Sequence, residues 1–576
     1  MKKENQNVWT GIEDKTGDAE LLESGKQEFF ELPLAESLTN EKSVDVPASR
    51  RDFLKYLGFG LGAATVAACD TPIKKALPYV VKPDEIVPGV ATYYASSFVN
   101  GGDYCSILVK TREGRPIKIE GNAMSPITKG GTSARTQAAV LSLYDTNRFQ
   151  NPGSVADGAI TEMEWSAMDK EIMAKLNTGG NIRIVTNTVM SPSTKQVFKA
   201  FTDKYPNAKV VSYDPVSSSA MLDANESNFG LRMVPGYRFD KADVIVSFNA
   251  DFLGTWVSPI EFARQYAEGR KIKDVKKAKM SRHIQVESGM TMTGSNSDNR
   301  ILVRPSEQGA AIAALHDAIA SKMGRAAAGG PKVNSRAAGQ LAKVANELIA
   351  AKGKSLVVCG NNNVGEHMLI NSINEMLGNY GNTLSFGDAS MQRQGSDADI
   401  QNLIKEMDGG RVDAVILYGA NPAFDLPNAA QFATAFAKVK TKISTALLMN
   451  ETTALCDYIA PDHHLLESWG DAQPKRGHYS IIQPTIQPLF NTRQTQESLL
   501  TWAGGAGMDS KADSPYYEYL RGFWKEYLFP QNGKFASFRS FWDSALHDGV
   551  AMISASELAP VFNGDARSAA AKLEKP

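Results

Sequence analysis

Short apolar runs alternate with turn residues and amphipathic stretches along most of the chain. Between residues 91 and 150 the runs are short, and residues 105–110 (CSILVK) and 116–120 (PIKIE) flank the segment TREGR at 111–115. Two strand-like runs around a short turn that contains glycine predict a β-hairpin. We therefore expect a small β-rich domain over residues 91–150.

After residue 150 the pattern changes to continuous apolar runs separated by helical stretches. The runs lie at residues 181–186, 209–212, 242–248, 284–287 and 301–303, before a predicted helix at 307–323, and again at 355–360, 383–386, 414–418 and 443–448. Strands that alternate with helices predict an α/β fold with doubly wound parallel sheets, whose ligand sites lie at the carboxyl ends of the strands. The segment AAAGGP at 326–331 marks a boundary, so the expected lobes are residues 151–330 and 331–505.

A different apolar run lies near the N-terminus. Residues 56–68 are apolar apart from Thr65 and contain three glycines, which disfavour a helix. A run of this length is shorter than the roughly 20 residues that a membrane span needs, but it suits the apolar region of an export signal. Just before it, SRRDFLK at 49–55 resembles the twin-arginine export motif, in which Arg50 and Arg51 are the receptor-read pair. A buried glycine-rich helix is the alternative.

Residues 66–69 (VAAC) follow the apolar run and resemble a lipobox, in which small residues precede a lipid-modified cysteine. We predict lipid attachment at Cys69, which would hold the protein at the periplasmic face of the cytoplasmic membrane. An ordinary cleavage in which Cys69 has no role is the alternative. Twin-arginine export carries folded cargo, so the predicted route involves the twin-arginine export machinery.

The segments on either side of the signal have unusual compositions. Residues 1–48 carry 11 acidic and 5 basic residues and predict a disordered leader. Residues 70–90 contain four prolines and predict an extended tether. Residues 506–576 form an aromatic helical tail that could pack on a partner subunit or on the body of this chain.

Overall composition excludes several classes of protein. The chain has 576 residues with a formal net charge of -1, so no basic field argues for nucleic-acid binding. Its four cysteines are Cys69, Cys105, Cys359 and Cys456, none in a C-x-x-C pair, so neither a zinc ribbon nor a local iron–sulfur motif is present. Cys359 and Cys456 lie in apolar runs and are predicted to be inert core residues.

Several segments in order resemble the molybdopterin oxidoreductase family. They are EGN at 120–122, ARTQA at 134–138, YDTNR at 144–148, ADVIVSFNADFLGTW at 242–256, TGSNSD at 293–298, GANP at 419–422 and CDYIAP at 456–461. The resemblance covers about residues 91–505 and implies a multi-domain α/β body with a small N-terminal domain.

The resemblance fails where that family holds its metals. Family members with an iron–sulfur cluster use C-x2-C-x3-C and a fourth cysteine, but Phe98, Gly101, Cys105 and Ser133 stand at those positions. A cluster needs about four thiolates. The loop that ligates molybdenum in the family matches residues 213–225, which contain no cysteine, although Ser217, Ser218 or Ser219 could serve. The resemblance therefore implies a body that lacks active molybdenum.

An acidic leader, a delayed twin-arginine signal and a cluster-free body together resemble the large iron–sulfur-type subunit of alternative complex III, a membrane quinol:electron-acceptor oxidoreductase. The resemblance implies integral membrane quinol-binding subunits and multihaem cytochrome subunits as partners. Iron–sulfur clusters are then expected in a ferredoxin-like half beyond residue 576 or on a separate polypeptide, and this chain is expected to be a scaffold. The alternatives are an active molybdopterin oxidoreductase of the polysulfide or thiosulfate reductase type, and a non-redox surface lipoprotein.

The densest polar cluster is DHHLLESWGD at 462–471. On a helix, His463 would lie four residues from Glu467 and His464 three residues from it, which would permit a metal or an acid–base pair. We favour a structural polar network, because no third ligand follows at a suitable spacing. Asn421, His463, His464 and the three serines are the vestigial cofactor-binding candidates.

Overall fold

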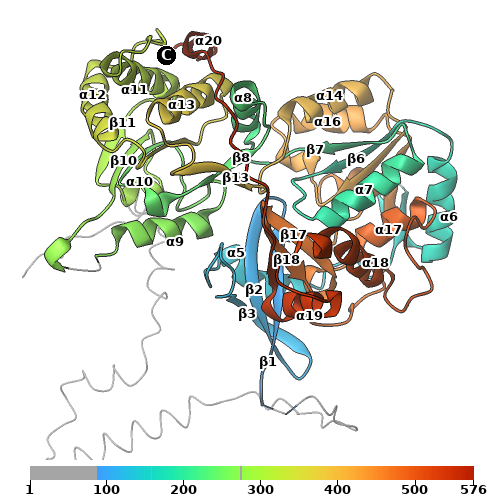
Figure 1. Cartoon of the computed structure of the whole chain (residues 1–576). Coiled ribbons are helices and arrows are strands. Elements are labelled where there is room, and N and C mark those ends of the chain that lie inside the picture. The colour runs from blue at the N-terminus through green and yellow to red at the C-terminus, as the bar shows by residue number, and fades with distance from the viewer. Residues whose placement is uncertain (1–86, 88, 157, 273–274) are drawn as a thin grey trace, which may run out of the picture. The chain divides into compact units, whose positions relative to one another are not determined.

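The computed structural model describes residues 87, 89–156, 158–272 and 275–576 (Figure 1). The described chain begins with a three-stranded antiparallel sheet of β1 (Thr92–Asn100), β2 (Asp103–Arg112) and β3 (Arg115–Gly121). The predicted hairpin is confirmed, with residues 111–115 at its turn. Helix α5 (Ala134–Leu143) packs on one face through Val140 and Leu143, because Ile107, Val109 and Ile119 alternate toward it.

A seven-stranded sheet forms the larger α/β layer. Its strand order is β5 (Ala159–Glu162), β4 (Gly153–Ala156), β16 (Tyr458–Ile459), β15 (Thr441–Ser444), β14 (Ala414–Tyr418), β6 (Ile182–Thr186) and β7 (Lys209–Ser212). The strands from β16 to β7 are parallel, and β4 and β5 extend the sheet in antiparallel pairing.

Helices cover both faces of this sheet. Ile184 packs with α6 (Trp165–Leu176), α7 (Pro192–Lys204) and α17 (Thr495–Trp502). The next residue, Val185, points to the other face and packs with α14 (Asp397–Asp408) and α16 (Ala429–Phe436). Strands that are apolar on both faces are expected for a parallel sheet between two helical layers.

A four-stranded parallel sheet forms the second α/β layer. Its order is β11 (Asn299–Leu302), β10 (Arg282–Glu287), β9 (Val244–Phe248) and β12 (Ser355–Cys359). One face packs on α11 (Gln308–Lys322), α12 (Ser335–Ala350) and α13 (Val364–Met376), and the other on α9 (Pro259–Arg270). The predicted α/β class, with doubly wound parallel sheets and a small N-terminal β-rich domain, is confirmed.

The sheets do not follow the division of the sequence at residue 330. The seven-stranded sheet takes β6 and β7 from the range 151–330 but β14, β15 and β16 from the range 331–505. The four-stranded sheet likewise takes β12 from the later range. Each layer is therefore built from two separate parts of the chain.

A five-stranded antiparallel sheet lies between the two α/β layers in Figure 1. Its order is β19 (Val550–Met552), β18 (His478–Ile482), β17 (Gly470–Lys475), β13 (Leu384–Ser390) and β8 (Val234–Tyr237). The remaining helices are α8 (Ser219–Phe229), α10 (Met292–Ser295), α15 (Pro422–Asp425), α18 (Pro515–Phe523), α19 (Phe538–Asp548) and α20 (Ala566–Ala570).

The aromatic tail packs on the body of the chain. Trp524 and Trp542 are buried with Ile481 of β18 in one cluster. Ala569 and Leu573, at and after α20, belong to the core that also contains α11 and α13. Of the two options for the tail, the structure shows contact with this chain. Within the described part of the protein, no helix is long and apolar enough to cross a bilayer.

Candidate functional site

Two adjacent parallel strands of the seven-stranded sheet, β14 and β6, define a topological switch point. The chain leaves β6 toward β7 on one side, whereas it leaves β14 toward β15 on the other. Such a divergence opens a crevice at the carboxyl ends of the strands. Asn187, directly after β6, donates from Nδ2 to the Gly419 carbonyl after β14 at 2.8 Å.

A cavity of about 600 Å³ opens at this switch point. Its walls come from the β1–β2 turn, helix α5, the segment that follows β6, the end of β14 and the 462–471 segment with β17. The polar side chains in these walls include Arg135, Asn187, Thr188, Ser191, Asp462, His463, His464, Asp471, Gln494 and Gln496. Asn187 Oδ1 is buried and has no hydrogen-bond partner among the described residues, so this wall has an acceptor available for a ligand.

The histidine segment is not the helix that the i,i+4 interpretation required. His464 has an extended backbone, and only residues Leu465–Glu467 form a single 3-10 turn. His464 Nε2 lies 2.8 Å from Ser142 Oγ, and His463 Nδ1 lies 2.6 Å from Thr492 Oγ1. The His463–Glu467 contact that a helix would permit is not formed, because the extended backbone turns His463 toward Thr492 while Glu467 pairs with another residue.

That other residue is Arg148. Its Nη2 lies 2.6 Å from Glu467 Oε2, and the two side chains are 1% and 0% exposed. Burial alone would raise the pKa of Glu467, but the hydrogen bonds from Arg148 and from two backbone N–H groups hold the pKa below its ordinary value. The polar network that the sequence favoured is thus present around Glu467, with an ion pair at its centre.

The titratable groups at the cavity wall are shifted toward their neutral forms. Burial raises the pKa of Asp462 to about 6, although Thr495 donates to both of its carboxylate oxygens. Burial also lowers the pKa of His463 and of His464 to about 4. Near neutral pH both imidazoles are uncharged, so each offers one hydrogen-bond donor and one acceptor.

Asp471 connects the cavity to the aromatic tail. Its carboxylate accepts hydrogen bonds from Ser191, Ser193 and Trp524, the last from Nε1 at 2.9 Å. Burial raises the pKa of this carboxyl, against the effect of these donors. The tail therefore supports one side of the cavity.

The chain shows similarity to known proteins over most of its length. No protein-family model matches it. The menaquinone reductase, molybdopterin-binding-like subunit of Nitratidesulfovibrio vulgaris (strain Hildenborough) is 23% identical over 522 residues, which cover 80% of this chain and 72% of that protein. Acetylene hydratase from Pelobacter acetylenicus superposes with a TM-score of 0.57 at 11% identity, over 80% of this chain and 74% of that one. The chain has a molybdopterin oxidoreductase-like fold.

In this molybdopterin oxidoreductase-like fold, three of the four positions expected for cluster ligands make other contacts, and the fourth, Gly101, lines the cavity. Phe98 and Cys105 face each other across β1 and β2 in the core beneath α5. Cys105 Sγ donates to the Gly131 carbonyl, and burial raises the pKa of its thiol to about 12. Ser133 caps α5 by accepting from Thr136 N. The space beside Phe98 and Ser133 is about 20 Å³, which suits a single water molecule.

The serine candidates lie at the start of α8, away from the residues that line the cavity. Ser217 Oγ donates to Asp397 at 2.8 Å, and Ser219 Oγ donates to Asp223 at 3.2 Å. Ser218 precedes the helix and makes no capping hydrogen bond. Because two of the three hydroxyls are used within the chain and none reaches the cavity, these residues do not fit a serine-ligated molybdenum.

Asn421 is also outside the cavity wall. Its Nδ2 donates to Glu451, and its Oδ1 accepts from Thr452. Of the vestigial candidates, the structure therefore brings only His463 and His464 together at the cavity. Among the residues described, no group of three or more His, Cys, Asp or Glu side chains is placed to hold a metal ion. Arg50, Arg51 and Cys69 lie outside the described residues.

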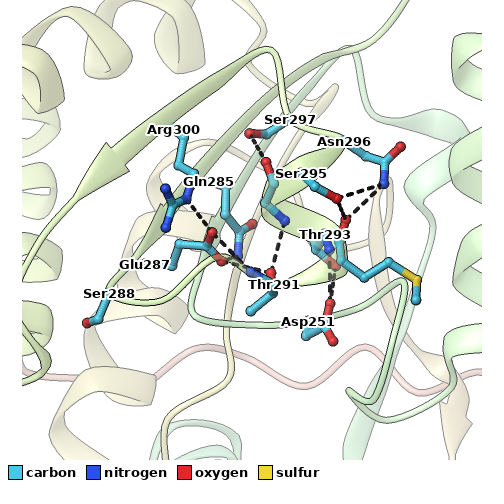
Figure 2. A network of polar contacts seen from close by, with 12 residues as sticks. Asp251, Gln285, Glu287, Ser288, Thr291, Thr293, Ser295, Asn296, Ser297 and Arg300 are labelled. Atoms are coloured by element: carbon cyan, nitrogen blue, oxygen red, sulfur yellow. Dashed lines mark hydrogen bonds and ion pairs between the residues drawn. The ribbon is translucent and has the colours of Figure 1, made fainter. Parts of the chain in front are cut away.

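Figure 2 shows a second polar network, at the carboxyl ends of the four-stranded sheet. Glu287, fully buried at the end of β10, accepts hydrogen bonds from Arg300 and Thr291. Asp251, which follows β9, accepts from the N–H and the hydroxyl of Thr293, at 3.0 and 2.7 Å. The TGSNSD segment thus forms internal hydrogen bonds, and the carboxylates of this edge are satisfied within the chain.

Sequence reasoning missed most of the cavity wall. The segment NTVMS at 187–191 was not among the predicted candidates, although it follows a buried strand. That position was the available signal, because ligand sites gather at strand ends. Arg135 lies in the ARTQA segment but had no predicted role, and Gln494 and Gln496 carried no local signal, since only the tertiary fold brings them to the cavity.

Proposed function

We propose that this chain is an exported, membrane-tethered subunit of a respiratory quinol:electron-acceptor oxidoreductase complex of the alternative complex III kind. In this role its molybdopterin oxidoreductase-like body is an assembly scaffold without active molybdenum. The similarity to a menaquinone reductase, molybdopterin-binding-like subunit supports a place in respiratory quinone chemistry.

One observation carries the scaffold assignment. Three of the four positions at which family members hold an iron–sulfur cluster are occupied by a packed Phe98 ring, a buried Cys105 thiol and a helix-capping Ser133. Each has a structural role in the N-terminal domain, so a cluster would require that core to be rebuilt. In the serine loop, Ser217 and Ser219 likewise donate hydrogen bonds to Asp397 and Asp223.

The remaining parts of the proposal come from the sequence. Export by the twin-arginine route rests on Arg50 and Arg51, and attachment at the periplasmic face of the membrane rests on Cys69. Electrons would pass through iron–sulfur clusters in a ferredoxin-like continuation or partner and through multihaem cytochrome subunits. Quinol would bind in integral membrane subunits.

The test is metal analysis of the full chain purified with its native membrane partners. We expect molybdenum far below one atom per chain, together with haem-containing and integral membrane subunits in the same complex. Stoichiometric molybdenum would contradict the proposal. It would support the alternative of an active molybdopterin oxidoreductase of the polysulfide or thiosulfate reductase type. The 600 Å³ cavity is the observation that favours this alternative. A chain isolated from its native membrane without any such subunit would instead support a non-redox surface lipoprotein.

A further inference from the structure

The free end of the N-terminal sheet carries exposed aromatic and basic side chains. It comprises the start of β1 and the β2–β3 turn, and we call it the sheet tip. In Figure 1 the blue strands reach beyond α19 at the lower edge of the body. Tyr93 and Tyr94 are 48% and 37% exposed, and Ile117 is 48% exposed.

The two tyrosines lie on opposite faces of the sheet. Tyr94 pairs with Val109 and faces the α5 side, whereas Tyr93 pairs with Lys110, whose Nζ lies 5.6 Å from the centre of the Tyr93 ring. On the α5 side, Tyr144 donates from Oη to the Pro116 carbonyl, which brings another exposed ring beside Ile117. Aromatic residues therefore surround the tip on both faces.

The charge of the tip is positive. Its basic residues are Lys110, Arg112, Arg115 and Lys118, and its acidic residues are Glu113 and Glu120. Lys118 pairs with Glu120 at 3.1 Å, and Glu113 accepts from the Gly89 N–H. Among the residues described, neither Arg112 nor Arg115 forms an ion pair with a carboxylate of the body. Within the part of the chain that the structure describes, two guanidinium groups thus remain for an external anion.

We infer that the sheet tip rests on the surface of a bilayer that contains anionic lipids. Tyrosine rings favour the headgroup region, and arginines near the surface are attracted to anionic headgroups. In Figure 1 the strands of the tip extend beyond α19, and such a projecting end can reach a flat surface. The chain also enters the described structure here: Thr92 lies 23 residues after Cys69, a segment that can span at most about 80 Å. A lipid at Cys69 would keep the tip at high effective concentration near the bilayer.

The first experiment measures binding without the predicted anchor. Full-length Cys69→Ser protein is mixed with vesicles of phosphatidylglycerol and phosphatidylcholine, and flotation gives the bound fraction. We expect binding that weakens with salt and is absent on pure phosphatidylcholine. Charge reversal by Arg112→Glu and Arg115→Glu should weaken binding at least about 25-fold, since each basic residue near the surface contributes roughly fivefold.

The matched control reverses the charge of two exposed lysines that lie on helices outside the tip. The substitutions are Lys322→Glu at the end of α11 and Lys405→Glu on α14. This variant has the same net charge as the tip variant, so it should keep most of the affinity. Equal loss in both variants would overturn the inference, because binding would then follow net charge alone. Unchanged binding in the tip variant would also overturn it.

A second experiment locates the contact. Cys105, Cys359 and Cys456 are buried, so a thiol-reactive dye on Glu113→Cys in the Cys69→Ser protein labels the tip selectively. Nitroxide lipids should quench this dye but not the same dye on Lys322→Cys. Absence of quenching at both sites would overturn the inference. If the tip bound only to membrane partner subunits, its partner would be a protein and not a lipid, which would also overturn the inference. These measurements do not require the complex, so they can fail while the proposed function stands.

Discussion

Two carboxyl groups in one short segment show how individual side chains set the character of the site. Glu467 faces the Arg148 guanidinium and has a pKa below its ordinary value, whereas Asp462 receives only neutral donors and its pKa rises to about 6. Burial acts against the charged form of both carboxyl groups, and the Arg148 guanidinium offsets this effect at Glu467. The sequence places both in one polar cluster but gives no sign that Arg148, more than 300 positions earlier, belongs to it.

The raised pKa of Asp462 predicts a pH-dependent contribution to stability. In the unfolded chain this carboxyl ionises near 4, while in the folded chain it ionises at about 6. Its contribution is therefore complete below about pH 4 and is lost as the pH rises through about 6. Relative to Asp462→Asn, the free energy of unfolding of the wild type should fall by about 3 kcal/mol between about pH 4 and pH 7.

Urea unfolding of both proteins across this pH range measures the difference. His463 and His464 are present in both proteins, so their opposite pH dependence cancels. Asp543→Asn, at an exposed side chain on α19, is the control and should give a flat difference. A flat difference for Asp462→Asn as well would contradict the assigned burial effect.

The Arg148–Glu467 pair predicts a large loss on substitution. Arg148→Met leaves the Glu467 carboxylate buried without its counter-ion, which should lower the free energy of unfolding by about 3–5 kcal/mol. Lys199→Met removes the pair with Asp203, whose side chains are 63% and 62% exposed, and should cost less than about 1 kcal/mol. Urea denaturation of the two variants gives the comparison, and similar small losses would show that burial does not set the energy of the Arg148 pair.

At the scale of elements, the contact between α13 and α20 requires a residue without a side chain. A Cβ at Gly365, in the first turn of α13, would lie 2.5 Å from the Ala569 carbonyl oxygen and 3.0 Å from Lys572 Cβ. Asp565 caps the short α20 by accepting from two backbone N–H groups. The capped helix and the glycine together let the C-terminal segment enter the core.

Gly365→Ala is therefore expected to destabilise the protein by about 1–3 kcal/mol through overpacking, and to release the C-terminal segment. Trypsin cleavage at Arg567 or Lys572 should become faster. The control is Gly339→Ala within α12, where no atom lies within 4 Å of the added Cβ. That variant should be more stable by roughly 0.5–1 kcal/mol, because alanine favours a helix. Equal cleavage rates in both variants would argue against a tight α13–α20 contact.

At the scale of the whole molecule, the two parallel sheets bind distant parts of the chain together. β6 pairs with β14, and β9 pairs with β12. In each pair one strand precedes the predicted boundary at residue 330 and the other follows it. A fragment of residues 91–330 would expose one edge of both sheets and the apolar faces beside them.

We therefore expect the 91–330 fragment to be insoluble or rapidly proteolysed by itself, and to gain protection when residues 331–576 are co-expressed with it. Limited proteolysis of the separate and co-expressed fragments measures this. A cooperative unfolding transition for 91–330 alone would show that the earlier range is an independent domain.

The sequence by itself determined the fold class, most of the strands and the N-terminal hairpin, because apolar periodicity and turn residues act over a few positions. It also singled out the positions that correspond to cluster ligands in the family and the polar segment at 462–471. Only the tertiary structure decided that two ranges of the chain share each sheet, that Arg148 neutralises Glu467, and that His463 and His464 line a cavity while Ser217 and Asn421 do not. These outcomes depend on contacts between residues far apart in the chain, and local periodicity carries no information about such partners.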